Sequence, residues 1–235
     1  MEDHARWSRL LADAGAQTEA APERICELCV EMLDVTGAGI SMVTESGNRG
    51  VVCSTDVVSA RIEDLQFTLG EGPCVDAVHS GAPVLIPDFD APGLALERWP
   101  AFIKGAAAAG AGAVFAFPLR IGAISVGAID LYRDRPGELD AGQLPSALMA
   151  ANAAALALLR LESGHDDLLS DDPSAGFTNE LQVHQATGMV QVQLGVSTEQ
   201  AFVLLRARAF AAGRPLADLA SDVVARRVRF SPEDQ

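Results

Sequence analysis

Three helices with well-marked ends are predicted by residues 178–230, which read TNELQVHQATGMVQVQLGVSTEQAFVLLRARAFAAGRPLADLASDVVARRVRF. Thr178 can cap the first of them. Val183 and Val190 then fall on one face of a helix, and Gly195 follows where helices commonly end in a left-handed residue. This stretch is therefore expected to fold as an all-helical unit.

The second and third helices have equally clear boundaries. Ser197 and Gln200 have the spacing of a capping box, and Gly213 ends the helix that they start. Pro215 suits the first turn of the third helix. The apolar stripe of that helix, typical of one buried face, consists of Leu216, Leu219, Ala220, Val223 and Val224.

The same residues resemble the ANTAR domain, the RNA-binding output module of bacterial transcription antiterminators. The resemblance covers Val183–Arg229 and implies a domain over residues 178–235 that binds RNA hairpins. Thr187 stands where the family usually carries a lysine. The matching landmarks, in order, are Ala186, Gly188, Met189, Gly195, Glu199, Ala201, Phe202, Leu205, Ala209, Leu219, Ala220, Val223 and Val224.

Charge is divided unevenly along the chain, whose net charge is −15. Residues 1–177 hold 11 Lys and Arg against 26 Asp and Glu, whereas residues 178–230 hold 6 against 4. An acidic chain as a whole argues against nucleic-acid binding, but the mildly basic tail keeps that function open. Six arginines are the candidates for contacting RNA phosphates: Arg206, Arg208, Arg214, Arg226, Arg227 and Arg229.

The front of the chain alternates helical and strand-like segments. Short strands are predicted at residues 38–44, 51–54, 84–86, 113–119 and 124–132. Helices are predicted near 7–14, 22–36, 73–79, 97–109 and 140–161, and residues 57–65 are amphipathic, helical or irregular. Helices packed on an antiparallel sheet make an α+β fold.

This front part resembles the GAF domain, a small-molecule or redox sensing module, over about residues 20–161. The landmarks are Gly70, Gly72, Ala77, Gly81, Pro83, Val84 and Asp88, followed by Pro118, Leu119, Gly127 and Leu131.

The GAF resemblance implies a pocket between the sheet and its covering segments. No charged set of residues that would select a nucleotide is evident, so an unidentified apolar ligand, or none, is expected and no cofactor is predicted. The candidate lining residues, each also compatible with ordinary core, are Phe67, Cys74, Phe89, Trp99, Phe102, Phe115 and Phe117.

The cysteines do not have the spacing of a metal site. Cys26 and Cys29 form a C-x-x-C inside a helical pattern, with neither a second C-x-x-C nor a nearby histidine, so no metal site is predicted. Cys74 lies early in a short helix, where a helix N-terminus would lower the pKa of a thiol. Known catalytic motifs are missing from the sequence, and we predict that the protein is not an enzyme. Because free methionine sulfoxide reductase uses cysteines on a GAF fold, Cys53 and Cys74 leave a thiol-dependent redox enzyme as an alternative.

The helix at residues 140–161 is apolar on two faces and needs two surfaces to bury against. One is the sheet; the other is the helix of a second copy, approached through alanines, or else the N-terminal helix of the same chain. Residues 162–177 form a polar linker between a sensor domain, 1–161, and the ANTAR domain, 178–235. No signal peptide or spanning helix is predicted, and we expect a cytoplasmic protein.

These observations lead to one predicted function. The chain is expected to be a homodimeric, signal-responsive antitermination regulator in which a GAF sensor controls RNA binding by the tail. Two alternatives remain: a dimeric protein-interaction module without RNA binding, and the thiol-dependent redox enzyme.

Overall fold

The computed structural model describes residues 7–13, 20–44, 47–91, 97–164 and 175–231. The chain divides into a larger N-terminal unit and a smaller C-terminal unit, each with its own apolar core. Each unit is described by itself below.

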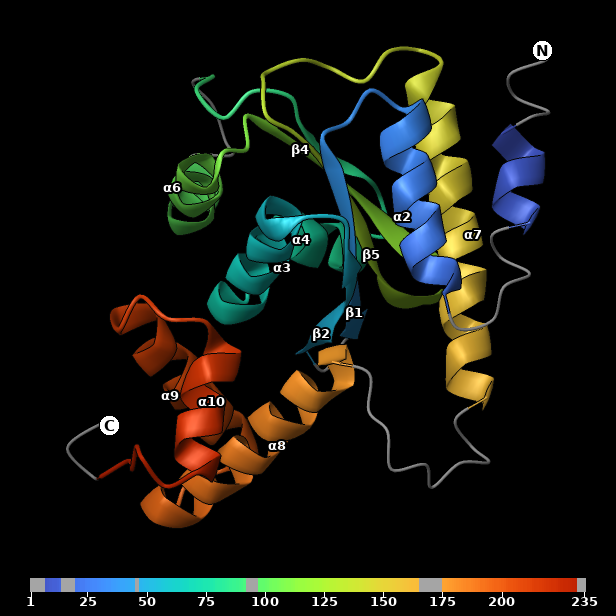
Figure 1. The fold of residues 1–235 in the computed structure, drawn as a ribbon. Helices are drawn as coiled ribbons and strands as arrows, with labels where there is room; N and C mark the ends of the chain where they lie inside the picture. The colour runs from blue at the N-terminus through green and yellow to red at the C-terminus, as the bar shows by residue number, and fades with distance from the viewer. Residues whose placement is uncertain (1–6, 14–19, 45–46, 92–96, 165–174, 232–235) are drawn as a thin grey trace. The chain divides into compact units, whose positions relative to one another are not determined.

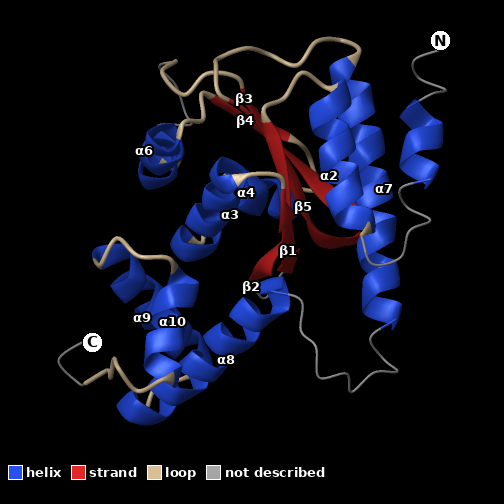
Figure 2. Ribbon diagram, in the orientation of Figure 1, coloured by secondary structure: helices blue, strands red, loops and turns tan. Residues whose placement is uncertain are grey.

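A five-stranded antiparallel sheet forms the middle of the N-terminal unit (Figure 2), with strand order β2-β1-β5-β4-β3. The strands are β1 (Gly37–Thr44), β2 (Gly47–Ser54), β3 (Val84–Ile86), β4 (Ala113–Ile121) and β5 (Ile124–Arg133). Helices accompany this antiparallel sheet, so the α+β prediction is confirmed.

One face of the sheet is covered by α2 (Ala21–Met32) and α7 (Gln143–Gly164), which lie side by side (Figure 1). The short N-terminal helix at 7–13 packs into the same core, where Trp7 is buried and its indole N–H donates to the Ser146 carbonyl at 2.9 Å. The alanines of α7 allow this close packing because they add little volume. Ala147, Ala150, Ala151, Ala154, Ala155 and Ala157 are all buried there.

The opposite face carries α3 (Val57–Leu69) and α4 (Pro73–Ser80), with α6 (Pro100–Ala109) packed against α3. Gly105 permits that last contact, since an added Cβ would lie 2.8 Å from the Leu65 side chain. The segment 57–65, which the sequence left as helical or irregular, is therefore helical because Asp56 caps it with a full capping box.

Several predicted boundaries shift. α6 begins at Pro100 rather than Glu97, and α7 begins at Gln143 because the Asp140 carboxylate accepts from the Gly142 and Gln143 amides at 2.7 and 2.8 Å. Gly15, the predicted end of the first helix, lies outside the described residues.

By length and composition alone, Gln143–Leu161 of α7 is the one helix among the described residues that could cross a membrane. Its buried alanines pack against α2 and the sheet, so that side of α7 belongs to the core of the domain.

The C-terminal unit is a bundle of α8 (Ala175–Leu194), α9 (Thr198–Ala211) and α10 (Leu216–Val224). The Ser197–Gln200 capping box is confirmed, with Ser197 Oγ accepting from the Gln200 amide at 3.2 Å. Gly195 and Gly213 have φ of 67° and 62°, the left-handed values predicted for them. α8 begins at Ala175 rather than Thr178.

Candidate functional site

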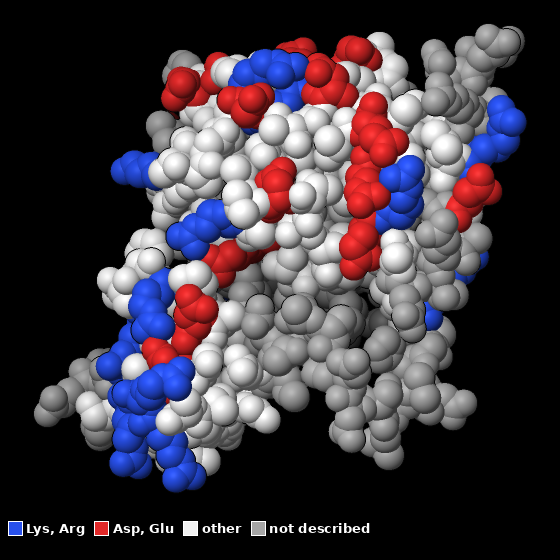
Figure 3. Space-filling view, viewed as in Figure 1, with Lys and Arg blue, Asp and Glu red and all other residues white. Residues whose placement is uncertain are grey.

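An open groove of about 830 Å³ runs along the C-terminal bundle between α8 and the segment 225–230 that follows α10. Its positive charge comes from Arg226 and Arg229, which carry no ion pair within the part of the chain that the structure describes. Figure 3 shows arginines gathered over α10 and this segment. The other lining residues are Gln185, Gly188, Met189, Val192, Gln193 and Val224.

The segment 225–230 is fixed against α8 by polar and apolar contacts. Gln193 Oε1 accepts from the Phe230 amide at 2.8 Å, and the Phe230 ring is buried. Arg208 lies over that ring at 4.7 Å from its centroid and donates to the Arg229 carbonyl at 3.1 Å. These contacts hold the two groove arginines in place.

Ion pairs within the bundle separate the predicted arginines into two groups. Asp222 accepts from Arg214 at 2.7 Å and from Arg227 at 2.6 Å, and these contacts lower the pKa of its carboxyl. Arg226, which follows Asp222 by four residues, does not pair with it. Arg226 and Arg229 lie beyond the third helix, which ends at Val224.

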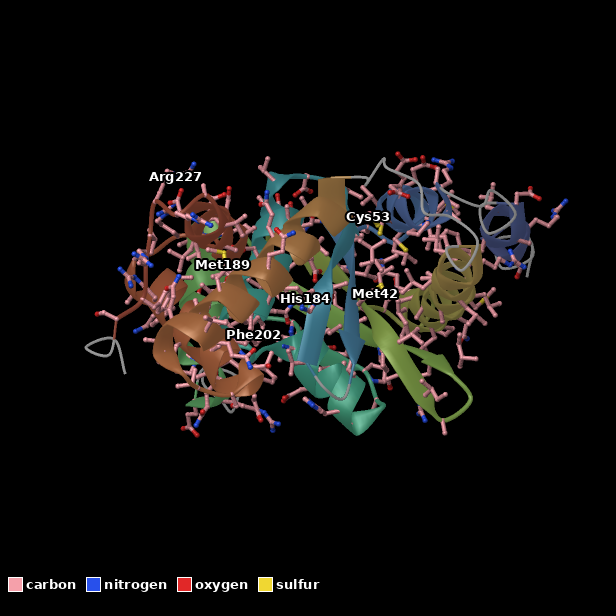
Figure 4. All side chains as sticks on the ribbon, turned by 90° about the horizontal axis from the view of Figure 1, so that it is seen from below. Met42, Cys53, His184, Met189, Phe202 and Arg227 are labelled. Atoms are coloured by element: carbon pink, nitrogen blue, oxygen red, sulfur yellow. The ribbon has the colours of Figure 1, made fainter. Side chains whose placement is uncertain are left out.

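Arg206 and Arg208, the two candidates on α9, are half-buried, with the Arg206 guanidinium 5.6 Å from the Phe202 ring centroid. On the same helix, the Phe210 side chain is 59% exposed. Figure 4 labels Met189 on α8 and Arg227 just after α10.

Thr187, at the position where a lysine is usual, is buried rather than exposed on a charged face. It shares the helical face of Val183 and Val190, and its hydroxyl donates to the Val183 carbonyl at 2.7 Å. A buried hydroxyl bonded in this way satisfies its own polar group. The missing lysine therefore removes no charge from the groove surface.

The backbone of Arg226 is strained. Its φ is 60°, a conformation in which glycine is normally found after a helix, and the Arg227 amide donates to the Asp222 carbonyl at 2.8 Å across the turn. An arginine at such a position is an outlier that points to a role for its side chain.

Replacing Arg226 by glycine is expected to raise the free energy of unfolding by about 1 kcal/mol, because glycine adopts positive φ without a Cβ clash. Urea unfolding followed by circular dichroism measures this. Arg227→Gly is the matched control: it removes the Asp222 ion pair and relieves no positive φ, so it should lower stability. If both variants changed the free energy of unfolding equally, the strain at Arg226 would be contradicted.

A second feature is a buried polar cluster between the sheet and helices α3 and α4. Sheet register places Asp130 of β5 between Gly39 of β1 and Ala116 of β4. Because those neighbours have little or no side chain, there is room for Glu63 to reach the sheet, and a Cβ on Gly39 would lie 2.8 Å from Glu63 Oε1. Glu63 and Asp130 are 1% and 3% exposed.

Gln66 and Cys74 complete the cluster from two helices. The Gln66 amide donates to Asp130 Oδ2, while its Oε1 accepts from the Cys74 backbone N–H at 2.7 Å. Gly72, with φ of 141°, starts α4 and leaves space for Gln66, since an added Cβ would lie 2.7 Å from Gln66 Oε1. Gly70 and Gly72 thus form the turn between α3 and α4.

The position of α3 is fixed at its first turn. Asp56 Oδ1 accepts from the Val58 and Ser59 amides, both at 2.8 Å, and its Oδ2 accepts from the Tyr132 hydroxyl at 3.0 Å. A helix attached to β5 in this way directs Glu63 toward Asp130.

Burial raises the pKa of Asp130 to about 7. The same cause, followed by the charge of Asp130, raises the pKa of Glu63 well above its ordinary value. For Cys74 the predicted effect of a helix N-terminus is wrong: burial, with Asp130 and Glu63 next, raises the pKa of its thiol well above the usual value.

The predicted ligand-lining residues do not gather in one place. Phe115 and Phe117 lie in the core on the α2 and α7 face, because alternate residues of β4 point to opposite faces. Phe102 belongs to α6 and makes an edge-to-face contact with Phe89, with ring centroids 6.4 Å apart. Trp99 directly precedes the same helix. Cys74 belongs to the opposite face, and Phe67 is a partly buried residue of α3. The sequence-based pocket containing all seven is wrong.

All four cysteines are free and buried, in two separate clusters. Cys26 and Cys53 bring their sulfurs to 3.6 Å on the α2 side of the sheet, where Figure 4 labels Cys53, whereas Cys74 is on the other side. Cys53 and Cys74 therefore do not form one thiol site.

In the presence of a chelator, the free energy of unfolding is expected to fall as pH rises from about 4 to about 7. The folded carboxyls of Glu63 and Asp130 have raised pKa values, so the folded state holds protons that the unfolded state releases. Glu63→Gln should flatten this dependence and stabilise the protein above pH 7, because it removes a buried carboxylate whose unpaired oxygens each cost about 1–3 kcal/mol. Urea unfolding with chelator from pH 4 to 8 measures it.

Glu97→Gln, which removes one exposed carboxyl, provides the control and should leave the pH profile unchanged. A Glu63→Gln profile that coincides with the parent's would contradict this description of the cluster.

The architecture, a sensor-type α+β domain followed by a three-helix bundle, agrees with comparisons to known proteins. The chain belongs to the GAF domain family, whose model matches residues 17–159, and residues 179–224 match the model of the ANTAR domain. It is thus a GAF–ANTAR protein with the two domains in the predicted order. No curated protein matches the sequence.

Solved structures share the GAF fold at low identity. A domain of a two-component sensor histidine kinase protein from Sinorhizobium meliloti 1021 matches with a TM-score of 0.52 and 19% identity, over 64% of this chain and 97% of that one. The GAF domain of an Acinetobacter phosphoenolpyruvate-protein phosphotransferase matches with a TM-score of 0.52 and 9% identity, over 73% and 98%.

Proposed function

We propose that this protein is a signal-responsive regulator whose ANTAR domain binds RNA hairpins and thereby prevents transcription termination. A regulator that combines a GAF sensor with an ANTAR domain is the class that the two family matches define, and ANTAR domains in general bind RNA. The observation that carries the proposal is the groove with Arg226 and Arg229, which form no ion pair with any residue that the structure describes.

The groove has the chemistry that RNA binding requires. Guanidinium groups bind phosphates in a charge-assisted, bidentate manner, and the amides of Gln185 and Gln193 add neutral polar groups beside them. Val192, which is 83% exposed, gives the same groove an apolar surface against which an unstacked base can pack. Two free arginines predict modest affinity, supported by shape and by two copies of the site in a dimer.

The arginines tied to Asp222 have a different part in this proposal. Arg214 and Arg227 share one carboxylate, so their charge is partly neutralised before any RNA arrives. They shape the turn that carries Arg226, and they contribute to the general positive potential of the bundle.

Arg226→Ala combined with Arg229→Ala is expected to weaken binding of a terminator-type hairpin about tenfold or more, because two phosphate contacts are lost. The slope of log affinity against log salt should decrease by roughly 1 to 2. Fluorescence anisotropy with hairpins from RNA pull-down and sequencing measures both, and read-through of a terminator in transcription reactions tests antitermination.

Arg24→Ala, which removes an exposed arginine of α2, is the control and should bind as the parent does. A parent protein that binds no hairpin would favour the protein-interaction alternative. The thiol-enzyme alternative has less support, because Cys74 is fully buried with a raised thiol pKa and is separated from Cys53.

We propose further that the protein is a cytoplasmic homodimer formed through α7. The alanine faces expected to contact a second copy are already covered within the subunit by α2, the sheet and the helix at 7–13. Among its described residues, α7 leaves three leucines exposed: Leu148 at 41%, Leu156 at 53% and Leu159 at 39%. Their helical spacing places them on one side of α7, which suits the same side of a second copy about a two-fold axis.

Leu148→Glu combined with Leu156→Glu is expected to convert the dimer to a monomer, because four charges would then meet in an apolar interface. Light scattering after size exclusion measures the mass. Val57→Glu is the matched control, since Val57 is 84% exposed at the start of α3 and should leave the mass unchanged. A parent that is monomeric at all concentrations would reject the dimer.

A further inference from the structure

Three potential metal ligands converge inside the GAF domain from elements far apart in the sequence. Glu63 of α3, Cys74 of α4 and Asp130 of β5 each present one ligand atom, and these atoms all lie within 4.8 Å of one another. All three residues are buried. Neither the proposed RNA groove nor the proposed dimer contact uses any of them.

Four polar atoms of this cluster lack a hydrogen-bond partner in the part of the chain that the structure describes when both carboxyls are ionised. Both carboxylate oxygens of Glu63, Oδ1 of Asp130 and Oγ of Ser41 are buried and make no hydrogen bond among the described residues. Ser41 is 1% exposed on β1, on the same sheet face as Asp130, because its register partner is Ala128. Buried polar atoms are nearly always satisfied, so such a group indicates something that completes it.

The spacing suits one ion. Zinc lies about 2.3 Å from a thiolate sulfur and about 2.0–2.2 Å from a carboxylate oxygen, so two ligand atoms of a tetrahedral site are roughly 3.3–3.7 Å apart. Side-chain rotations that move the ligand atoms by up to about 1 Å would bring the cluster to that size. Asp130 already has the supporting contact that ligating carboxylates require, because Gln66 donates to its other oxygen.

We propose that Glu63, Cys74 and Asp130 bind a single divalent transition-metal ion of the Zn²⁺ type inside the GAF domain. Ser41 Oγ or a water supplies a fourth ligand. The thiolate favours such an ion over Mg²⁺ or Ca²⁺, which select oxygen ligands alone. Three anionic ligands around a doubly charged ion leave one net negative charge, far less than the empty ionised cluster would hold.

The ion has a structural consequence for the sensor. It would join α3, α4 and β5, three elements that otherwise meet through the hydrogen bonds of Gln66 and Asp56 and through apolar packing. Metal occupancy is thus coupled to the packing of both helices on the sheet. The inference does not rest on RNA binding.

The test uses the full chain, stripped with chelator during partial unfolding and refolded with Zn²⁺ or Co²⁺, because the site is fully buried. Native mass spectrometry should find one Zn²⁺ per chain, and the melting temperature should rise by roughly 5 °C at saturating Zn²⁺. Co²⁺ should give a thiolate-to-cobalt charge-transfer band in the near ultraviolet. Mg²⁺ at the same concentration should produce no shift.

Variants assign the site. Cys74→Ser should abolish the charge-transfer band, and Glu63→Gln and Asp130→Asn should each weaken Zn²⁺ binding by roughly 10- to 100-fold or more, the loss expected even for an outer-shell partner. Both carboxyl variants keep shape and remove a buried charge, so they are expected to fold. Cys29→Ala is the matched control: it removes another fully buried thiol, on the α2 side, and should retain the ion and the band.

Two results would overturn the proposal. One is a refolded parent that holds less than about a tenth of an ion per chain at saturating Zn²⁺, where roughly one is expected. The other is Zn²⁺ binding by Glu63→Gln and Cys74→Ser as tight as that of Cys29→Ala.

Discussion

The contact between α3 and β5 through buried carboxyls sets the arrangement of the sensor half. Asp130 sits in the middle of the sheet, Glu63 faces it from α3, and Gln66 links Asp130 to the start of α4. Gly39 leaves room for Glu63, because a larger residue there would exclude it. One polar cluster, formed by Glu63, Gln66, Cys74 and Asp130, is thus accommodated in an apolar core. The sheet register and the turn between α3 and α4 both depend on it.

Features determined by local sequence were predictable. The Ser197–Gln200 box, the left-handed Gly195 and Gly213, and the stripe of α10 each depend on residues within one or two turns, so spacing alone finds them. The antiparallel sheet was predictable from its alternating segments and from family landmarks. The first residues of helices were less predictable, because an upstream capping residue such as Asp140 decides where a helix begins.

The buried cluster could not be found in this way. Glu63, Cys74 and Asp130 have no motif spacing, and each alone resembles an ordinary surface acid or core thiol. Only the pairing of β1, β5 and β4 shows that Asp130 points into the core. The same alternation separated Phe115 and Phe117 from the other predicted lining residues, which composition alone could not show.

Arginine function was similarly decided by tertiary contacts. The sequence treats six arginines as equivalent, but Asp222 holds two of them, Phe202 and Phe230 lie beneath two more, and Arg226 and Arg229 remain for the groove. The chain leaves α10 before Arg226 and adopts a strained φ there, which brings Arg226 to the groove beside α8.

Both candidate sites share a physical property: each costs stability in the state described. A left-handed arginine costs about 1–2 kcal/mol relative to ordinary backbone, and unsatisfied buried oxygens cost about 1–3 kcal/mol each. A glycine after α10, or an apolar pair in place of Glu63 and Asp130, would remove these costs without changing the fold. Departures from local preference concentrate where a side chain serves a ligand rather than the core. The strained turn offers arginine to an anion, and the carboxyl cluster offers unpaired oxygens to a cation, so the two domains carry sites of opposite charge preference.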